Sequence, residues 1–231
     1  MKISKQRKGV VVMTKVKAGV KVKKAKKAEL HITRDHRGKM KDMQSISTSC
    51  KCNKRCEKNA KIKGSICESC FAQRQLDYMT SMQVPLERNF KLLTKGILPL
   101  EDLPYLNVFM FRIESFGDLA NVTQAINYLN LIRKNPWCHF AWWTKNPDFI
   151  AKAFKKTGYE KPKNLIIIRS SLMVNKPVKP GYWFVDKVFT VYDKEYAKTH
   201  GIEINCGARH CFTCHTCYFD NGVIYINELK K

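Results

Sequence analysis

Cysteine residues are concentrated near the end of this chain, where the sequence reads INCGARHCFTCHTC. The groups that could do chemistry here are Cys206, Cys211, Cys214, Cys217, His210 and His215. Thiols and imidazoles at such short spacings can form disulfides, attach haem, or bind zinc or an iron–sulfur cluster. The stretch therefore indicates a redox or metal-binding centre, and the rest of the chain must decide which.

A second cysteine group lies earlier in the chain, in the stretch CKCNKRCEKNAKIKGSICESC. Its members are Cys50, Cys52, Cys56, Cys67 and Cys70. A turn at these spacings can direct several sulfurs at one metal centre, while the lysines between them offset the negative charge. Zinc needs four closed ligands, which leaves one cysteine over, and a cubane held by three cysteines with one open iron is the alternative.

The composition favours metal binding over disulfides. The chain has 231 residues and is 44% hydrophobic, which is enough for a packed core without cross-links. No apolar run is long enough to cross a bilayer, and charge interrupts GVVVMTKVKAGV too soon for a signal peptide. We therefore expect a cytoplasmic protein with no membrane partner. In a reducing compartment, clustered cysteines are metal ligands more often than disulfide partners.

The chain is strongly basic, with 43 Lys and Arg against 19 Asp and Glu and a formal net charge of +24. Residues 1–28 contain eleven basic side chains and no acidic one. Such a segment attracts a polyanion, and we expect nucleic acid to bind it in a salt-sensitive way, although a solvated arm is the alternative. We place a basic N-terminal arm at residues 1–49 and a cysteine-rich domain at residues 50–231. Whether the nucleic acid is DNA or RNA is left open, and so is the oligomeric state of the protein.

Strands and helices alternate between the two cysteine groups. Runs typical of buried strands are LNVFMFRIES, WCHFAWWT, NLIIIRSSL, KVFTVYD and IEINC. Runs typical of helices are FAQRQLDYMTSMQVPLERNFKLLTKG, NVTQAINYLNLIRKN, NPDFIAKAFKKTG and KEYAKTHG. This repetition predicts an α/β fold, namely an incomplete parallel β/α barrel with its site at the carboxyl ends of the strands.

Polar residues end three of these strands. They are Glu114, Ser115, Gly117 and Asp118 after the first, Thr144 and Lys145 after the second, and Arg169, Ser170 and Ser171 after the third. Together they would line a common mouth, although each alone could meet water or cap the next helix. Arg112 and Arg169 lie inside apolar strands, where an unpaired charge is costly. An internal ion pair with Glu114 is the structural explanation we weigh against a functional one.

Two stretches carry a resemblance to a known family. The stretch CESCFAQRQLDYMTSMQVPLERNFKLL contains Cys70-Phe71-Ala72 and Arg88-Asn89, and FRIESFGDLANVTQAINYLNLIRKNPWCHFAWWTKNPDFI contains Arg112 through Asp118 and Trp142-Trp143-Thr144-Lys145. On these motifs the chain resembles, roughly from Cys50 to Cys217, the phage- and plasmid-borne family called gene product 88. That family is in turn similar to radical S-adenosylmethionine enzymes, in which a cysteine loop precedes a partial β/α barrel.

The resemblance implies a 4Fe-4S cluster at the first cysteine group, bound S-adenosylmethionine, and a phage or mobile-element protein acting in the host cytoplasm. The cofactor would be bound by the strand-end residues Glu114, Ser115, Gly117, Asp118, Lys145 and Ser170. No catalytic residue and no substrate follow from it. The chain splits the radical enzymes' Cys-x3-Cys-x2-Cys into Cys52-x3-Cys56 and Cys67-x2-Cys70, and it inserts Phe116 into a Ser-Gly-Asp motif.

We interpret the C-terminal group as a second, auxiliary iron–sulfur cluster. Its cysteine spacing is similar to that of ferredoxins, and IEINC as a strand would deliver Cys206 to the same mouth. Structural zinc fits four thiolates equally well. The run CFTCH also matches a haem-attachment signature, which belongs outside the reducing cytosol. We expect His210 and His215 outside the ligand set, and Cys138 in the core.

Two functions from different classes follow. In the first, an iron–sulfur enzyme cleaves S-adenosylmethionine and modifies a substrate at the mouth, with nucleic acid as the candidate substrate. In the second, both cysteine groups hold zinc, and the chain is a nucleic-acid-binding or host-interaction protein without catalysis. The β-α repeats favour the enzyme, and the charge favours the binder. Aromatic residues able to stack on bases are Trp137, Trp142, Trp143 and Phe212, although a buried core explains most of them.

Deleting residues 1–28 should weaken binding to nucleic acid. The eleven basic residues of this segment release counterions when they contact phosphates. We expect the deletion variant to bind an oligonucleotide less tightly, and with a shallower dependence of log K on log salt, when fluorescence anisotropy is recorded over a salt series. An unchanged affinity and slope would refute the assignment of nucleic acid to this arm.

Overall fold

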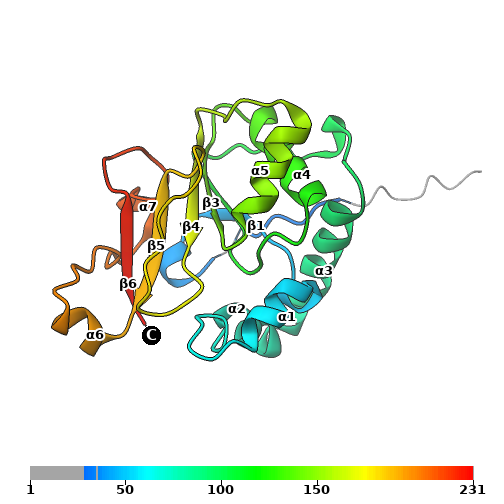
Figure 1. Ribbon diagram of the computed structural model, residues 1–231. Coiled ribbons are helices and arrows are strands. Elements are labelled where there is room, and N and C mark those ends of the chain that lie inside the picture. The colour runs from blue at the N-terminus through cyan, green and yellow to red at the C-terminus, as the bar shows by residue number, and fades with distance from the viewer. Residues whose placement is uncertain (1–28, 35, 231) are drawn as a thin grey trace, which may run out of the picture.

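The protein is described here by a computed structural model that covers residues 29–34 and 36–230, so most of the predicted basic arm lies outside the described residues. Six strands form one all-parallel sheet in the order β1-β2-β3-β4-β5-β6 (Figure 1). The strands are β1 (Gln44–Ile46), β2 (Met110–Ile113), β3 (His139–Thr144), β4 (Leu165–Ser170), β5 (Lys187–Tyr192) and β6 (Tyr225–Leu229). The prediction of an α/β fold with a parallel sheet is confirmed.

Helices connect most of the strands. Between β1 and β2 lie α1 (Lys54–Ala60), α2 (Phe71–Tyr78) and α3 (Thr80–Lys95); α4 (Val122–Lys134) follows β2, and α5 (Pro147–Thr157) follows β3. After β5 come α6 (Lys194–Thr199) and α7 (Cys211–Cys214), and three short 3-10 turns are η1 (Gly38–Met40), η2 (Cys50–Cys52) and η3 (Leu100–Asp102). Among the described residues, no helix is long and apolar enough to cross a membrane.

The two faces of the sheet are covered by different parts of the chain, because successive side chains of a strand point in opposite directions. Phe111 and Phe140 belong to the main core, which α3, α4 and α5 cover (Figure 1). Met110 and Ala141 belong to a second core, in which Tyr218 of the C-terminal segment packs on the opposite face. The C-terminal cysteine segment therefore closes the face that the long helices leave open.

The start of α4 and the end of α5 agree with the sequence signals. Asn121 accepts a hydrogen bond from the backbone N–H of Gln124 at 2.9 Å, as an N-cap residue does. Gly158 ends α5 in the left-handed region, with φ of 67°. Both signals act within one helical turn, so the sequence alone reveals them.

The long helix predicted over residues 71–96 is instead two helices. Tyr78 ends α2, Met79 leaves the helical region, and Thr80 begins α3. The side-chain amide of Gln83 donates a hydrogen bond to the Leu76 carbonyl oxygen at 2.6 Å. This contact satisfies a carbonyl group that the interrupted helix leaves free, which makes the break tolerable.

The stretch IEINC is not a strand, so that prediction was wrong. The side chain of Asn205 bridges to β6 instead, donating to the Tyr225 carbonyl and accepting from the Asn227 backbone N–H, both at 2.8 Å. The Cys206 backbone N–H donates to the Asn227 carbonyl at 3.0 Å. An amide side chain thus takes the place of a strand ladder beside β6, which sequence reasoning did not find.

The sheet begins inside the stretch assigned to the basic arm. β1 pairs in parallel with β2, with Ser45 opposite Arg112, and it lies within residues 29–49. On its other side Thr33 and Ser45 form an antiparallel bridge, and Leu30 is buried in the main core. The described part of residues 1–49 is therefore part of the folded domain.

An ion pair of Glu114 with Arg112 or Arg169, the structural alternative weighed above, is not formed. The Arg112 guanidinium lies over the Trp143 ring at 3.8 Å, and Arg169 donates to the carbonyls of Lys179 and Pro180 at 2.9 and 3.3 Å. Glu114 has φ of 58°, which turns its carboxylate away from the face that Arg112 occupies. The backbone angle at Glu114 therefore accounts for the missing contact with Arg112.

Gly117 should tolerate no side chain. A Cβ at this position would lie 2.6 Å from the Thr48 carbonyl oxygen, and that oxygen is backbone and cannot move aside cheaply. We expect Gly117→Ala to lower the free energy of unfolding by about 1–3 kcal/mol, measured by urea denaturation. Gly96→Ala is the matched control, because a Cβ at Gly96 would have no other atom within 4 Å, and no loss is expected there. Equal stabilities for the two variants would contradict the close approach.

Candidate metal centres

A buried carboxylate holds the segment that leads into the first cysteine group. Glu114 follows β2 and is 3% exposed. Its oxygens accept hydrogen bonds from Tyr128 Oη at 2.7 Å, Gln124 Nε2 at 2.7 Å, Thr48 Oγ1 at 2.8 Å and the Thr48 backbone N–H at 3.1 Å. Burial raises the pKa of Glu114 to about 7, although the bonds from Tyr128 and Thr48 act in the opposite direction. Glu114 thereby fixes the backbone just before Cys50 to β2 and α4.

Serine side chains extend this attachment. Ser115 Oγ lies 3.0 Å from Ser45 Oγ and 2.8 Å from Ser47 Oγ, and the Ser115 backbone N–H donates to Ser47 Oγ at 2.9 Å. From α3, Asn89 Nδ2 donates to the Ser47 carbonyl at 2.9 Å. These contacts lie at the carboxyl ends of β1 and β2. The SISTS run at residues 45–49 is therefore a fixed approach to the cysteines.

Four cysteines of the first group lie close together. The Cys50 thiol donates to the sulfur of Cys70, which raises the pKa of Cys50 and lowers that of Cys70 to about 6. Burial is the largest cause of the raised pKa values of Cys56 and Cys67. The neighbouring thiols add to it, because Cys67 raises the pKa of Cys56 and Cys70 raises the pKa of Cys67. Cys52 is not among the groups that shift the pKa of these four cysteines.

Lys145 and Asp118 place charges of both signs beside these sulfurs. Burial lowers the pKa of the Lys145 ammonium, but Asp118 and the sulfurs of Cys67, Cys56 and Cys70 together raise it by more. Asp118 accepts hydrogen bonds from Thr144 Oγ1 at 2.6 Å and from the Lys145 backbone N–H at 3.0 Å. The ends of β2 and β3 therefore deliver a cation to the space between three cysteines.

Helix starts position two of these cysteines. Asn53 Oδ1 accepts from the Arg55 backbone N–H at 3.0 Å at the start of α1, and its Nδ2 donates to the Asp118 carbonyl at 2.8 Å. Cys56 lies in the first turn of α1, so this cap ties it to the end of β2. Cys70 immediately precedes α2, whose first backbone amides help to lower its pKa.

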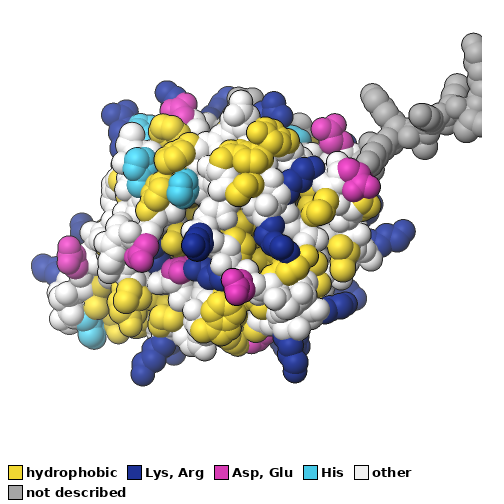
Figure 2. Space-filling model, turned by 90° about the horizontal axis from the view of Figure 1, so that it is seen from above, with side chains coloured by type: hydrophobic (Ala, Val, Ile, Leu, Met, Phe, Trp, Pro, Cys, Tyr) yellow, Lys and Arg dark blue, Asp and Glu magenta, His cyan; other side chains and the backbone are white. Residues whose placement is uncertain are grey.

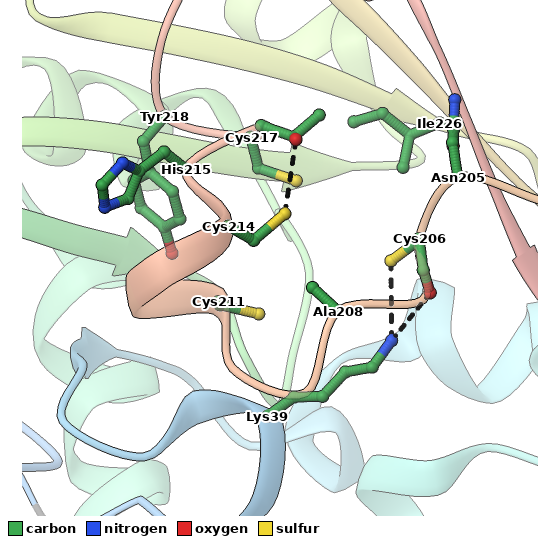
Figure 3. Close-up of a pocket in the computed structure, with 11 residues that line it drawn as sticks. Lys39, Asn205, Cys206, Ala208, Cys211, Cys214, His215, Cys217, Tyr218 and Ile226 are labelled. Carbon is green, nitrogen blue, oxygen red and sulfur yellow. Dashed lines mark hydrogen bonds between the residues drawn. The ribbon is translucent and has the colours of Figure 1, made fainter.

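The C-terminal cysteines line a cavity of about 30 Å³ on the sheet face opposite the long helices. The sulfurs of Cys206, Cys211, Cys214 and Cys217 border one space (Figure 3). From η1, Lys39 Nζ donates to the Cys206 carbonyl at 3.0 Å and to Glu228 at 2.8 Å, and it lies 3.6 Å from the Cys206 sulfur. A cation therefore borders this group of thiols as well.

A buried lysine holds the loop that follows Cys217. Lys187 on β5 is 2% exposed, and its ammonium donates to Asn221 Oδ1 at 2.6 Å and to the Val223 carbonyl at 2.8 Å. Burial lowers the pKa of Lys187, with Cys217 acting in the opposite direction. These bonds offset the cost of burying the ammonium and fix the chain between Cys217 and β6.

The two cysteine groups form separate sites. The charges acting on the first group are those of Lys145 and Asp118, whereas Arg112 and Lys39 act on the second. The C-terminal group packs on the face of the sheet instead of at the strand ends, where we had expected Cys206. The reason is that the segment runs beside β6 without joining the sheet as a further strand.

The remaining aromatic and sulfur side chains divide between core and surface. Cys138 is fully buried in the main core, as expected, and so is Trp142. Trp143 is half-buried beneath Arg112, while Trp137 and Phe212 are each 41% exposed. His215 lines the cavity of the C-terminal cysteines, and His210 precedes α7. The expectation that neither histidine is a metal ligand stays a prediction.

The chemistry of both sites fits a thiophilic metal. Within the described residues, no three His, Cys, Asp or Glu side chains are already placed to coordinate one ion, so the sulfurs would have to move inward on binding. Thiolates select zinc and iron–sulfur clusters.

The strand-end residues predicted to bind the cofactor form two sets. Glu114, Ser115 and Asp118 direct their oxygens to partners within the protein. Gly117 lies against Thr48 and leaves no room between them. These four residues position the cysteine-bearing segments. Lys145, half-buried among the cysteines, and Ser170, 8% exposed at the end of β4, are the two that remain next to the strand ends without such a role.

Sequence reasoning missed three residues that build the sites. Asn53 carried a signal, since an Asn directly before KRCEKNA is a typical N-cap. Tyr128 carried none, because its position on α4 reads as an ordinary core residue. Lys39 lies 167 residues from Cys206 along the chain, so no local pattern could pair them.

Comparison with known proteins gives this chain no family. No family model matches it, and neither a curated protein nor a solved structure does. The resemblance to gene product 88 and to radical S-adenosylmethionine enzymes stays a prediction. The fold and the two cysteine sites therefore carry the functional argument.

The stability of the protein should respond to pH through Glu114. Its pKa is raised from 4.5 to about 7, so the folded state binds this proton more tightly than the unfolded state does. The stabilisation is present below about pH 4.5 and is lost as the pH rises to about 7, by about 3 kcal/mol in all.

Urea denaturation of the parent and of Glu114→Gln between pH 4.5 and 7.5 tests this expectation. The free energy of unfolding of the parent, relative to that of the variant, should fall across this range, because glutamine does not titrate. A difference that stays constant with pH would show that Glu114 is already ionised throughout.

Proposed function

We propose that the protein is an iron–sulfur enzyme of the radical S-adenosylmethionine type that acts on nucleic acid. The observation that supports it is the arrangement of Cys56, Cys67 and Cys70 around Lys145, directly after β1 and beside the carboxyl end of β3. In parallel β/α folds this edge of the sheet carries the active site. A thiolate set at this edge fits a cluster that takes part in chemistry.

The packing of Cys50 indicates which thiols are the ligands. Cys50 is 6% exposed and packs with Ala72, Leu76 and Leu86 in an apolar cluster, as a core residue does. The proposed ligands are therefore Cys56, Cys67 and Cys70, three thiols that would hold a cluster of the radical S-adenosylmethionine type. Bound there, such a cluster would supply the electron for cleavage of S-adenosylmethionine.

The chain's own residues then have defined tasks. The Lys145 ammonium offsets the thiolate charge and offers a partner to a carboxylate, such as that of S-adenosylmethionine. Asp118 holds the backbone of Lys145 in place. Phe116, the residue inserted into the expected Ser-Gly-Asp motif, packs against the same apolar cluster as Cys56 and Cys70.

The second cysteine group is proposed to hold one zinc ion. Four thiols line its cavity, which is the number that closed structural zinc sites use. A second iron–sulfur cluster, the expectation from spacing alone, is the alternative. Either metal would fasten the C-terminal segment onto the open face of the sheet.

A second candidate function is supported by the charge. A protein with zinc in both sites, a net charge of +24 and no catalysis would be a nucleic-acid-binding or host-interaction factor. The resemblance to a phage- and plasmid-borne family is compatible with both functions. The metal content separates them.

Metal analysis of protein purified without oxygen is the test. We expect about four irons and about one zinc per chain, with a broad absorption band near ~400 nm that bleaches on reduction. Colourless protein with about two zincs would refute the enzyme and support the binding factor. About eight irons would keep the enzyme and replace the proposed zinc by a second cluster.

Cysteine variants assign the sites. Cys67→Ser should lose the iron and keep the zinc, whereas Cys214→Ser should lose the zinc and keep the iron. Cys52→Ser is the matched control and should keep both metals, because Cys52 lies outside the proposed ligand set of Cys56, Cys67 and Cys70. Loss of iron from Cys52→Ser would contradict the ligand set.

A further inference from the structure

Two loops at the carboxyl ends of the strands are joined into one surface. They are residues 51–70, which include α1 and carry most of the first cysteine group, and residues 169–180, which begin with the last two residues of β4. Their pairing consists of a bridge between Ser65 and Met173 and of backbone hydrogen bonds from Ile66 to Leu172 at 2.8 Å and from Val174 to Gly64 at 3.2 Å. We call this surface the basic collar.

The collar concentrates positive charge. Its two loops contain nine basic and two acidic residues. The basic ones are Lys51, Lys54, Arg55, Lys58, Lys61, Lys63, Arg169, Lys176 and Lys179. Of the acids, Glu57 pairs with Lys61 at 2.8 Å, and Glu68 accepts from the Gly64 backbone N–H at 2.8 Å. Most of the cations therefore have no acid within the collar.

Four of these lysines are free to meet a ligand. Lys58, Lys63, Lys176 and Lys179 are all exposed, and in the described part of the chain no carboxylate forms an ion pair with them. The opposite end of the molecule differs, because there Lys and Arg side chains are mixed with acidic, histidine and apolar ones (Figure 2). The unbalanced charge thus gathers at the end that carries the first cysteine site.

An exposed aromatic ring lies beside the same site. Phe71 directly follows Cys70 and is 59% exposed, with its ring centroid 6.4 Å from that of Phe116. A large apolar ring at the surface is costly to hydrate, and a nucleic-acid base stacked on it would cover it. The surface therefore offers both contacts that single-stranded nucleic acid needs, namely cations for phosphates and a ring for a base.

We propose that the basic collar binds single-stranded nucleic acid along its phosphates and stacks one base on Phe71, which places that strand at the first cysteine site. This inference deepens the proposed function and rests on it only for the role of the cysteine site. An atom inside a duplex cannot reach a site at the end of a sheet, so a strand with accessible bases is the form that fits. The collar is distinct from residues 1–28, which lie outside the described structure.

The test compares two quadruple variants of the full chain. One replaces Lys58, Lys63, Lys176 and Lys179 with Gln; the matched control replaces Lys152, Lys155, Lys156 and Lys163, which are exposed on and just after α5. Both lose the same net charge, so a long-range effect would be equal in the two. Binding of a fluorescent single-stranded oligonucleotide is measured by anisotropy over a salt series.

We expect the collar variant to lose about tenfold or more in affinity at ~0.1 M salt, and its slope of log K against log salt to be shallower by about 3, since each lost phosphate contact on a single strand removes about 0.7. The control variant should keep the slope of the parent within about 0.5. Equal losses in the two variants, or no loss in the collar variant, would overturn the proposal.

Phe71→Leu tests the stacking contact. This variant should bind the single strand several-fold more weakly with an unchanged salt slope, because it removes a ring and no charge, and binding of the same sequence as a duplex should not change. If the parent binds duplex as tightly as single strand and Phe71→Leu alters neither, the assignment to single-stranded nucleic acid is wrong.

Metal content measured on the same preparations separates this inference from the proposed function. Collar variants that lose binding in a protein without iron would uphold the collar and refute the enzyme. An iron-containing protein whose collar variant binds like the parent would refute the collar and leave the enzyme standing. Unchanged metal content and thermal midpoints across the variants exclude misfolding as the cause of a loss.

Discussion

The buried carboxylate of Glu114 is the interaction on which the first site depends. It joins the end of β2 to the backbone before Cys50 through Thr48, and to α4 through Gln124 and Tyr128. A carboxyl group that is 3% exposed is costly unless its oxygens are hydrogen-bonded, so these partners stabilise the fold only when all are in place. The position of the cysteine loop is therefore coupled to the packing of the main core.

The same sheet serves two sites because its edges and faces are used differently. At the carboxyl edge, Asp118 and Lys145 place charges beside thiols from the loop after β1. On the face that α3, α4 and α5 do not cover, the C-terminal segment packs its cysteines against the strands, and Lys39 and Lys187 hold it there. Parallel β/α folds carry their chemistry at the carboxyl edge of the sheet, and a face closed by a segment of the same chain suits a structural metal. This division is the physical basis for assigning different metals to the two groups.

Sequence patterns predicted this fold where the signal was local. The caps of α4 and α5 are contacts within one turn, and the alternation of β2, β3 and β4 with helices reads directly as a parallel α/β sheet. Patterns failed where a side chain replaced the backbone's usual partner. Asn205 took the place of a strand ladder, and Gln83 allowed a helix to break that the sequence reads as continuous. Neither of these side-chain hydrogen bonds changes the spacing of the hydrophobic residues, so no argument from periodicity could have revealed them.

The sequence by itself determined the chemical inventory: two groups of thiols, polar residues after the apolar strands, and a large excess of positive charge. Residue type and spacing are local properties, so they are legible without a structure. The tertiary structure decided which of these groups meet. It brought Lys39 to Cys206 across 167 residues, and it turned Glu114 away from Arg112 through one backbone angle. The physical reason is that such encounters depend on how the whole chain packs, which no local spacing encodes.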